Sequence, residues 1–318
     1  MTITSAPQPG RVNTPNHPGS PRVSVCIPAY QAERHLQATL ESILAQDVDG
    51  LEIVVIDNNS SDGTRGILDR VHDPRVRVIR NTSTVPVVDN FNLAVRRSRG
   101  EFVKLVCADD ILAPGCIGAQ AAILDDLDDV ALVSTRTDFI DEQGRLLRPA
   151  RGLAGITGRH AAGQVIKRIV RSGTNPVGAP VATMFRRRDF DRCGGFRNEP
   201  WLPDLDLWVR LLALGDFFGT PNTLAAFRIG TGSITALTSS SSQLSEQNRF
   251  AHRLAADPRW RITTADTLCG RLKSIDMQVR RTGLYGVSAL RDARYRSVRR
   301  RRSRSQLAMT SAGDDGGS

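Results

Sequence analysis

The sequence predicts an α/β fold with a doubly wound, mostly parallel sheet and flanking helices. Short β-rich runs alternate with segments of helical periodicity four times between residues 23 and 106. This alternation is typical of right-handed βαβ units, which place consecutive strands in a parallel sheet. Three of the runs end in polar clusters, and the carboxyl ends of parallel strands share one edge of the sheet. We therefore expect these clusters to meet in a single ligand-binding crevice.

The strands are expected where the chain is apolar and rich in β-branched residues, at 23–27, 51–56, 76–79 and 102–106. The helices are expected between them, at 33–46, at about 64–72 and at 87–97. In the first helix, the spacing of Leu36, Leu40 and Ile43 is that of a helix with one buried face.

The strand ends carry the candidate ligand-binding residues. Pro28 and Tyr30 follow the first strand, a polar turn at 57–64 follows the second, and Asp109 and Asp110 follow the fourth. Carboxylates are hard oxygen ligands that suit Mg²⁺ or Mn²⁺ shared with substrate phosphates. Two adjacent acids can equally cap the helix that follows them, so the pair alone leaves both interpretations open.

The turn after the first strand argues against two common nucleotide-binding motifs. It reads Pro-Ala-Tyr-Gln-Ala-Glu and lacks the glycines that bring a dinucleotide close to the backbone. The chain also has no glycine-rich loop ending in Gly-Lys-Ser or Gly-Lys-Thr. The remaining expectation is a site that neutralises a diphosphate with a metal ion and carboxylates.

Length and composition indicate a cytoplasmic protein with one large domain. The chain has 318 residues, a net charge of +10, no apolar run of membrane-spanning length and no hydrophobic secretory segment. Its five cysteines are scattered without metal-ligand spacing, which fits reduced thiols. The five histidines also show no ligand spacing and are expected on the surface.

Taken together, the residues at 23–30, the turn at 57–64 and the Cys-Ala-Asp-Asp stretch at 107–110 resemble the family 2 glycosyltransferases. The resemblance extends from about residue 23 to residue 236. It implies the GT-A fold and an inverting transfer of sugar from a nucleotide-diphospho-sugar, UDP- or dTDP-linked, to a hydroxyl. The acceptor implied is a saccharide or a lipid-linked molecule, as in cell envelope polysaccharide assembly.

The resemblance also implies roles for individual residues. The expected donor-binding residues are Pro28, Tyr30, Glu33, Asp57, Asp109 and Asp110. Asp109 corresponds to the metal ligand of the family's D-x-D motif, and the implied cofactor is Mg²⁺ or Mn²⁺. Many members have a further aspartate where this chain has Cys107. A thiol does not replace a carboxylate as a ligand of Mg²⁺, so we interpret Cys107 as a packing residue.

A second candidate site lies at the start of an amphipathic helix expected from about Asp204. An acid there can cap free N–H groups and complement the helix dipole. The resemblance instead implies that Asp204 is the catalytic base, because Trp208 and Arg210 follow it as in the family. Two departures from the family are Pro203 in place of a glutamate and the absence of a histidine near Gly230.

The positive charge is concentrated near the C-terminus. Eight arginines and one acid lie between Arg291 and Arg304, and such a segment can contact an anionic membrane surface at about 1 kcal/mol per arginine. The expected organisation is a disordered leader at 1–21, a GT-A domain at 22–236, a helical extension at 237–290, and a basic, then disordered tail at 291–318.

Three alternatives to a glycosyltransferase remain open at this stage. A nucleotidyltransferase also uses metal and acids on a doubly wound sheet, but it usually carries a Gly- and Lys-rich loop that this chain lacks. A non-catalytic nucleotide-sugar-binding protein with a decayed site would explain Cys107, Pro203 and Gly230. The third is a nucleic-acid binder that acts through the arginine-rich tail, but nucleic acid is not expected as a partner because the domain shows no interleaved aromatic residues, which make up only 5% of the chain.

Overall fold

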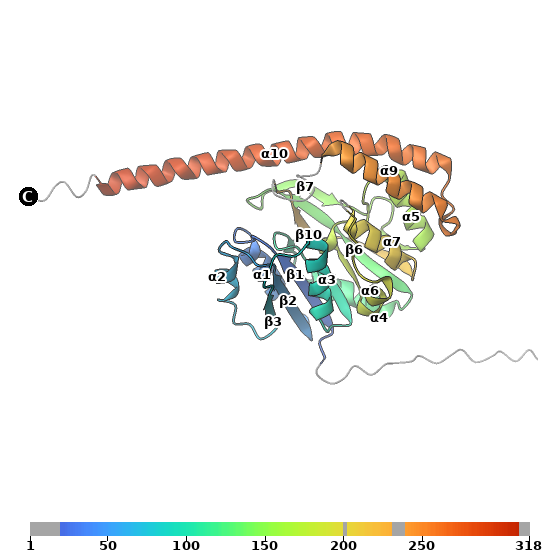
Figure 1. The fold of residues 1–318 in the computed structure, drawn as a ribbon, viewed down its shortest axis with the longest axis horizontal. Coiled ribbons are helices and arrows are strands. Elements are labelled where there is room, and N and C mark those ends of the chain that lie inside the picture. The colour runs from blue at the N-terminus through green and yellow to red at the C-terminus, as the bar shows by residue number, and fades with distance from the viewer. Residues whose placement is uncertain (1–19, 200–201, 231–238, 312–318) are drawn as a thin grey trace, which may run out of the picture.

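A ten-stranded mixed sheet lies at the centre of the described chain, which comprises residues 20–199, 202–230 and 239–311 of a computed structural model (Figure 1). Along its main path the strand order is β3-β2-β1-β4-β9-β6-β10-β5, and β7 and β8 pair with β6 and β10. The strands are β1 (Val23–Ala29), β2 (Leu51–Asp57), β3 (Val76–Arg80), β4 (Phe102–Leu105), β5 (Ile111–Leu112), β6 (Val130–Ile140), β7 (Leu146–Arg151), β8 (Gly158–His160), β9 (Thr183–Arg186) and β10 (Asp216–Arg228).

Helices cover both faces of this sheet, as the sequence predicts. One apolar cluster packs beneath α1, α2 and α4, and a second packs beneath α3, α5, α6, α7 and α9. The α-helices are α1 (Leu36–Leu44), α2 (Thr64–Leu68), α3 (Val87–Arg97), α4 (Cys116–Asp126), α5 (Ala162–Ser172), α6 (Arg187–Cys193), α7 (Pro203–Leu212), α9 (Ser240–Ala256) and α10 (Thr264–Ser311). Two 3₁₀ helices are η1 (Pro180–Ala182) and η2 (Pro258–Trp260).

The first four strands confirm the predicted parallel arrangement. β1 pairs in parallel with both β2 and β4, and β2 pairs in parallel with β3. Beyond β4 the sheet becomes mixed, because β9 runs antiparallel to both β4 and β6 while β6 and β10 are parallel. The carboxyl ends of β1, β2 and β4 therefore lie at the same edge, where the sequence predicts the crevice.

Local sequence explains why α3 occupies its predicted range. Its first turn follows Pro86 and contains Asp89, whereas its last turn contains Arg96 and Arg97. Acids near the amino end and bases near the carboxyl end of a helix complement its dipole. The buried apolar residues of α3, Val88, Ala94 and Val95, pack against β1 and β2.

The C-terminal region differs from the expected organisation. The expected helical extension at 237–290 contains two α-helices, and Pro258 separates α9 from α10 because it has no N–H for a helical hydrogen bond. The expected boundary at residue 290 falls inside α10, which runs to Ser311 without a break. Much of the basic segment therefore continues a helix. The leader at 1–19 and the last residues, 312–318, lie outside the described part of the chain.

Helix α10 lies along one side of the domain and extends beyond it (Figure 1). Its 48 residues correspond to about 70 Å at the rise of an α-helix. Near its start, Gly270 approaches the end of α5 so closely that a Cβ would lie 1.9 Å from the carbonyl oxygen of Val170. Farther on, the Ser288 hydroxyl donates a 2.7 Å hydrogen bond to the Ile229 carbonyl. Among the described helices, none has the length and apolarity together that crossing a bilayer requires.

Candidate active site

The ends of β1 and β2 place three of the predicted donor-binding residues side by side. Pro28 pairs with Ile56 and Ala29 with Asp57, so Asp57 ends its strand next to the end of β1. The Asp57 side chain is buried, and its Oδ1 accepts a 3.0 Å hydrogen bond from the Ser60 N–H. Tyr30 follows at once and is 53% exposed. An exposed aromatic ring beside a buried carboxylate can stack on a base while the acid accepts hydrogen bonds from it.

Glu33 forms hydrogen bonds between the two loops that follow these strand ends. Its carboxylate accepts the Gly63 N–H at 2.7 Å, and its own N–H donates to Asp62 Oδ2 at 3.0 Å. A Cβ on Gly63 would lie 2.8 Å from the Glu33 carboxylate, so a larger residue there would displace the end of the Glu33 side chain. Glu33 thus joins the loop after β1 to the turn after β2.

Asp109 and Asp110 follow β4 and are held by Arg228 at the end of β10. The Arg228 N–H donates to Asp110 Oδ1 at 3.0 Å, and its Nε donates to the Asp109 carbonyl at 2.8 Å. The contact arises because β5 directly follows the acid pair and runs antiparallel to the end of β10. Arg228 is almost completely buried and also donates to the Asp141 carbonyl at 2.8 Å.

The electrostatic state of the acid pair follows from this environment. Burial raises the pKa of both carboxyl groups, and the charge of Asp109 raises the pKa of Asp110 further. The positive charge of Arg228 acts in the opposite direction on the pKa of each. The pair is thus short of positive charge, although one buried arginine is already present.

The acid pair and its neighbours fit a divalent cation. Ligand-capable side-chain atoms of Cys107, Asp109 and Asp110 lie within 4.8 Å of one another. Asp110 Oδ2 is buried without a hydrogen-bond partner, and such an oxygen is costly unless it is protonated or bound to a cation. The two carboxylates suit Mg²⁺ or Mn²⁺, whereas the thiol does not.

One histidine prediction is wrong, because His35 is largely covered. Its side chain is 16% exposed, and its Nε2 lies 2.9 Å from Glu142 Oε2. Arg34 contacts the same carboxylate oxygen at 2.9 Å. Proximity to His35 lowers the pKa of Asp109, and proximity to Glu142 raises it, so both side chains belong to the surroundings of the acid pair. Nothing in the local sequence marks them, since Glu142 comes from the loop after β6.

Asp204 lies in the first turn of α7, where the sequence places it. Its Oδ1 accepts the Leu205 N–H at 2.8 Å, and its Oδ2 accepts the Asn175 side-chain amide at 3.1 Å. Burial raises the pKa of this carboxyl group from 3.8 to about 6, despite those hydrogen bonds and the charge of Arg281. A carboxylate tuned in this way is ionised at neutral pH yet is a stronger base than an exposed aspartate. Asn175 comes from a segment that the sequence left unassigned, whereas Arg281 comes from the expected helical extension at 237–290.

The structure brings Asp204 to the same place as the acid pair. Burial raises the pKa of the Cys107 thiol well above its usual value, and the charges of Asp110, Asp109 and Asp204 raise it further. All three carboxylates are therefore close enough to Cys107 to act on one thiol. Cys107 is partly buried against the apolar cluster, as expected of a packing residue. The site thus combines an adjacent carboxylate pair held by Arg228 with a single carboxylate, Asp204, held by Asn175.

Comparison with known proteins identifies the family. The sequence family described as "Glycosyl transferase family 2" matches residues 24–194, more than half of the chain. The chain belongs to glycosyltransferase family 2. An uncharacterized protein of Mycobacterium tuberculosis, MT1568, is 31% identical over 218 residues, which are 67% of this chain and 68% of that protein.

Solved structures agree with a family 2 glycosyltransferase of the GT-A fold. S. aureus TarS in complex with UDP-GlcNAc has a TM-score of 0.57 at 17% identity, over 74% of this chain and 67% of that one. Mannosyltransferase PcManGT from Pyrobaculum calidifontis, in complex with GDP-Man and Mn²⁺, has a TM-score of 0.56 at 19% identity, over 85% and 80% of the two chains. At these identities the likeness concerns the fold. The chain spans about two thirds of the length of several relatives.

Proposed function

We propose that this family 2 glycosyltransferase transfers a sugar, with inversion and metal assistance, from a UDP- or dTDP-linked donor to a hydroxyl group. The observation that carries the proposal is the arrangement of three carboxylates around Cys107, one of which has its pKa raised to about 6. Transfer to a hydroxyl requires a base for the nucleophile and positive charge for the departing diphosphate. The site offers a carboxylate suited to each task.

On the donor side, Asp57 and Tyr30 would bind the nucleoside, and Pro28 would shape the end of β1 beneath them; the pairing of Ala29 with Asp57 supports this assignment. Glu33 acts by fixing the loop after β1 to the turn after β2. Asp109, together with Asp110, would hold Mg²⁺ or Mn²⁺, which supplies positive charge to the diphosphate when bound. Arg228 keeps the acid pair in place and adds a fixed positive charge of its own.

On the acceptor side, Asp204 accepts the proton of the attacking hydroxyl. Its hydrogen bonds with Leu205 and Asn175 fix the orientation of the carboxylate before the acceptor arrives. The attack comes from the face of the sugar opposite to the diphosphate, which inverts the configuration at the anomeric carbon. A decayed, non-catalytic site is less consistent with a buried carboxylate that is held and tuned in this manner.

A thermal-shift screen tests the donor assignment. We expect UDP, dTDP or their sugar conjugates to raise the melting temperature, and to do so more strongly when Mn²⁺ is present, because a ligand that binds only the folded state stabilises it by mass action. GDP and ADP serve as controls for general affinity for nucleotides. A larger shift with GDP would contradict the uridine or thymidine preference, and shifts that do not depend on Mn²⁺ would contradict the metal.

A further inference from the structure

Helix α10 carries a row of exposed apolar side chains along the part that crosses the domain. Leu268, Leu272, Ile275 and Val279 are between 51% and 70% exposed, and Leu290 is 67% exposed. At 100° per residue, all five positions fall within a sector of about 60° on the helix. Gly286 lies in the same sector and Gly283 lies about 20° beyond it, and both are exposed. These five large side chains are called the α10 stripe below.

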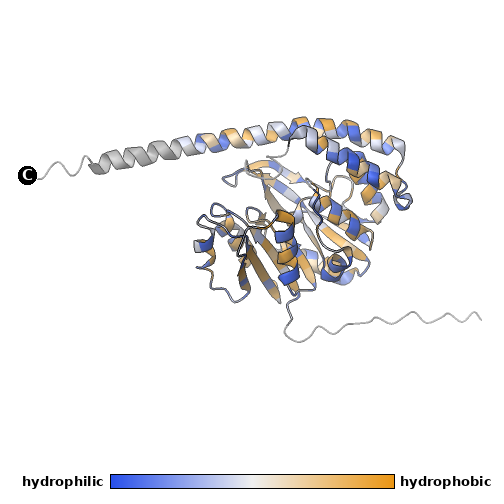
Figure 2. Cartoon of the chain, in the orientation of Figure 1, coloured by the Kyte–Doolittle hydropathy of each residue, from blue (hydrophilic) through white to orange (hydrophobic). Residues whose placement is uncertain are grey.

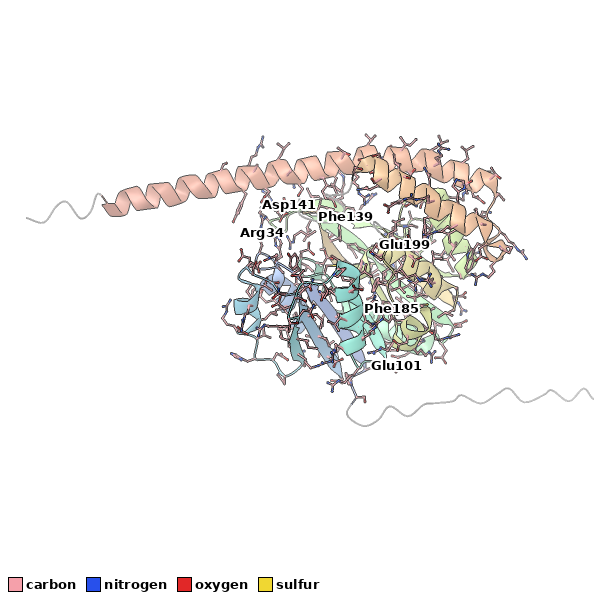
Figure 3. All side chains as sticks on the ribbon, in the orientation of Figure 1. Arg34, Glu101, Phe139, Asp141, Phe185 and Glu199 are labelled. Atoms are coloured by element: carbon pink, nitrogen blue, oxygen red, sulfur yellow. The ribbon has the colours of Figure 1, made fainter. Side chains whose placement is uncertain are left out.

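The opposite side of the same helix is polar and buried. Asp266, Ser274, Ser288 and Asp292 are each at most 4% exposed. Asp266 pairs with Arg171 at 2.6 Å, and Asp292 pairs with Arg34 at 2.6 Å, so this side is fixed to the domain. Figure 3 shows Arg34 and Asp141 on the side of the domain that faces α10, where Asp141 also lies 3.6 Å from Arg291. The usual helix pattern is reversed, because the apolar face is turned away from the core.

Such a face is unfavourable in water. Apolar patches that remain exposed on a folded chain usually mark an interaction surface. Hydrophobic residues recur along the coloured part of α10 over the domain (Figure 2), and the exposed large hydrophobic residues of the described chain include none on α5 or α9. The helix cannot simply rotate to bury the stripe, because the Asp266 and Asp292 ion pairs and the close approach of Gly270 to α5 hold its other side.

The charges around the stripe favour one kind of partner. Arg271, Arg280 and Arg294 lie on either side of it and are exposed, and the acid near it, Asp276, is paired with Arg280 at 2.9 Å. The same helix continues into the run of eight arginines that ends at Arg304. A basic helix with one apolar face is the pattern of a segment that lies in the surface of an anionic bilayer. A second copy docked with its α10 parallel to this one would bring two arginine runs of the same sign together.

We propose that the α10 stripe inserts into the surface of an anionic lipid bilayer, with the arginines of the same helix contacting the headgroups. The helix then lies between the bilayer and the domain. Arg281, whose charge acts on Asp204, is on this helix, so the candidate active site faces α10 from the other side. Binding in this orientation leaves the width of one helix, about 10–12 Å, between the headgroups and the side of α10 that carries Arg281. An acceptor anchored in lipid would be presented at that distance. The lipid contact does not depend on the proposed sugar transfer.

Co-sedimentation with vesicles tests this directly. The full chain is mixed with vesicles of phosphatidylcholine containing about one third phosphatidylglycerol, or with phosphatidylcholine alone, at low and high salt. We expect binding to the anionic vesicles only, weaker at high salt. The double substitution Leu272→Ser with Val279→Ser should raise the lipid concentration for half-maximal binding by about tenfold or more, because two side chains no longer enter the bilayer.

The control is Leu214→Ser, which removes a side chain that is 37% exposed just after α7 rather than on α10. It should bind vesicles like the wild type, and circular dichroism should show that all variants retain their helices. Equal binding by the double variant and the wild type would overturn the proposal, since the attraction would then be purely electrostatic. If the wild type instead fails to bind vesicles and forms a dimer in light scattering that the double variant does not form, the stripe contacts a second copy of the chain.

Discussion

Asp204→Asn is expected to lose about 10²–10⁴-fold in transfer rate while it binds the donor normally, because a placed general base contributes a factor of that size. The amide keeps the size of the side chain, and its oxygen can still accept the Leu205 N–H. In the wild type, the rate should fall below about pH 6, where the base becomes protonated. Initial rates measured between pH 5 and 8 test both statements.

The pKa of Asp204 also predicts how the stability of Asp204→Asn relative to the wild type changes with pH. The folded state raises the pKa of Asp204 from 3.8 to about 6, so it binds this proton more tightly than the unfolded state does. The contribution of the carboxyl group to stability is therefore lost as pH rises through that window, and above it the ionised group remains a cost. Asparagine does not titrate. The difference in melting temperature, variant minus wild type, should therefore increase as the pH is raised from 4 to 7.5.

Asp206→Asn is the matched control, since it lies on the same turn of α7. Asp206 is paired with Arg210 at 2.8 Å and does not act on Cys107 as Asp204 does. Its substitution should lower stability slightly and leave most of the transfer rate. If Asp204→Asn keeps full turnover and Asp206→Asn loses it, then Asp206 is the catalytic base and Asp204 only caps the helix.

Asp109→Asn should abolish the part of donor binding that depends on metal. Removing one of two carboxylates takes away both a ligand and half of the negative charge that attracts the cation. Titration calorimetry of UDP, with and without Mn²⁺, is the measurement. In the wild type Mn²⁺ should increase the affinity for UDP, and in the variant the two affinities should coincide. The fold should persist, because Asp109 lies in the loop after β4 and outside the apolar clusters.

Asp110→Asn separates direct binding from positioning. Asp110 accepts the Arg228 N–H, and asparagine can retain that hydrogen bond through its oxygen. If Asp110 mainly supports Asp109, its variant should lose less of the Mn²⁺ effect than Asp109→Asn does. An unchanged Mn²⁺ effect in Asp109→Asn would contradict the assigned metal ligand, whatever the result for Asp110.

The sheet edge could be predicted because it depends on local patterns. Apolar β-rich runs fix β1 to β4, and parallel strands necessarily end at one edge, so the neighbourhood of Asp57 and Asp109 follows from periodicity alone. The roles of those acids and of Asp204 came from the family resemblance. An acid in the first turn of a helix has the same sequence signature whether it caps the helix or removes a proton.

The partners of the site residues could not be predicted, because they come from distant segments. Arg228 reaches the acid pair through the pairing of β5 with β10, and the sequence separation is 118 residues. His35 meets Glu142 across 107 residues. Such contacts depend on tertiary packing and leave no periodic trace. The orientation of α10 depends on tertiary contacts in the same way, because the domain holds the polar side of this helix and leaves Leu272 and Val279 exposed.

The anomeric configuration of the released sugar tests the central claim most directly. The claim is that Asp204 and the Asp109–Asp110 pair act from opposite faces of the same sugar. Proton NMR can follow the first product formed from an α-linked UDP-sugar, with water as the acceptor if no saccharide accepts it. We predict that the β anomer appears first and that Asp204→Asn suppresses it. The α anomer as first product would contradict inversion and, with it, the assignment of the two sides of the site.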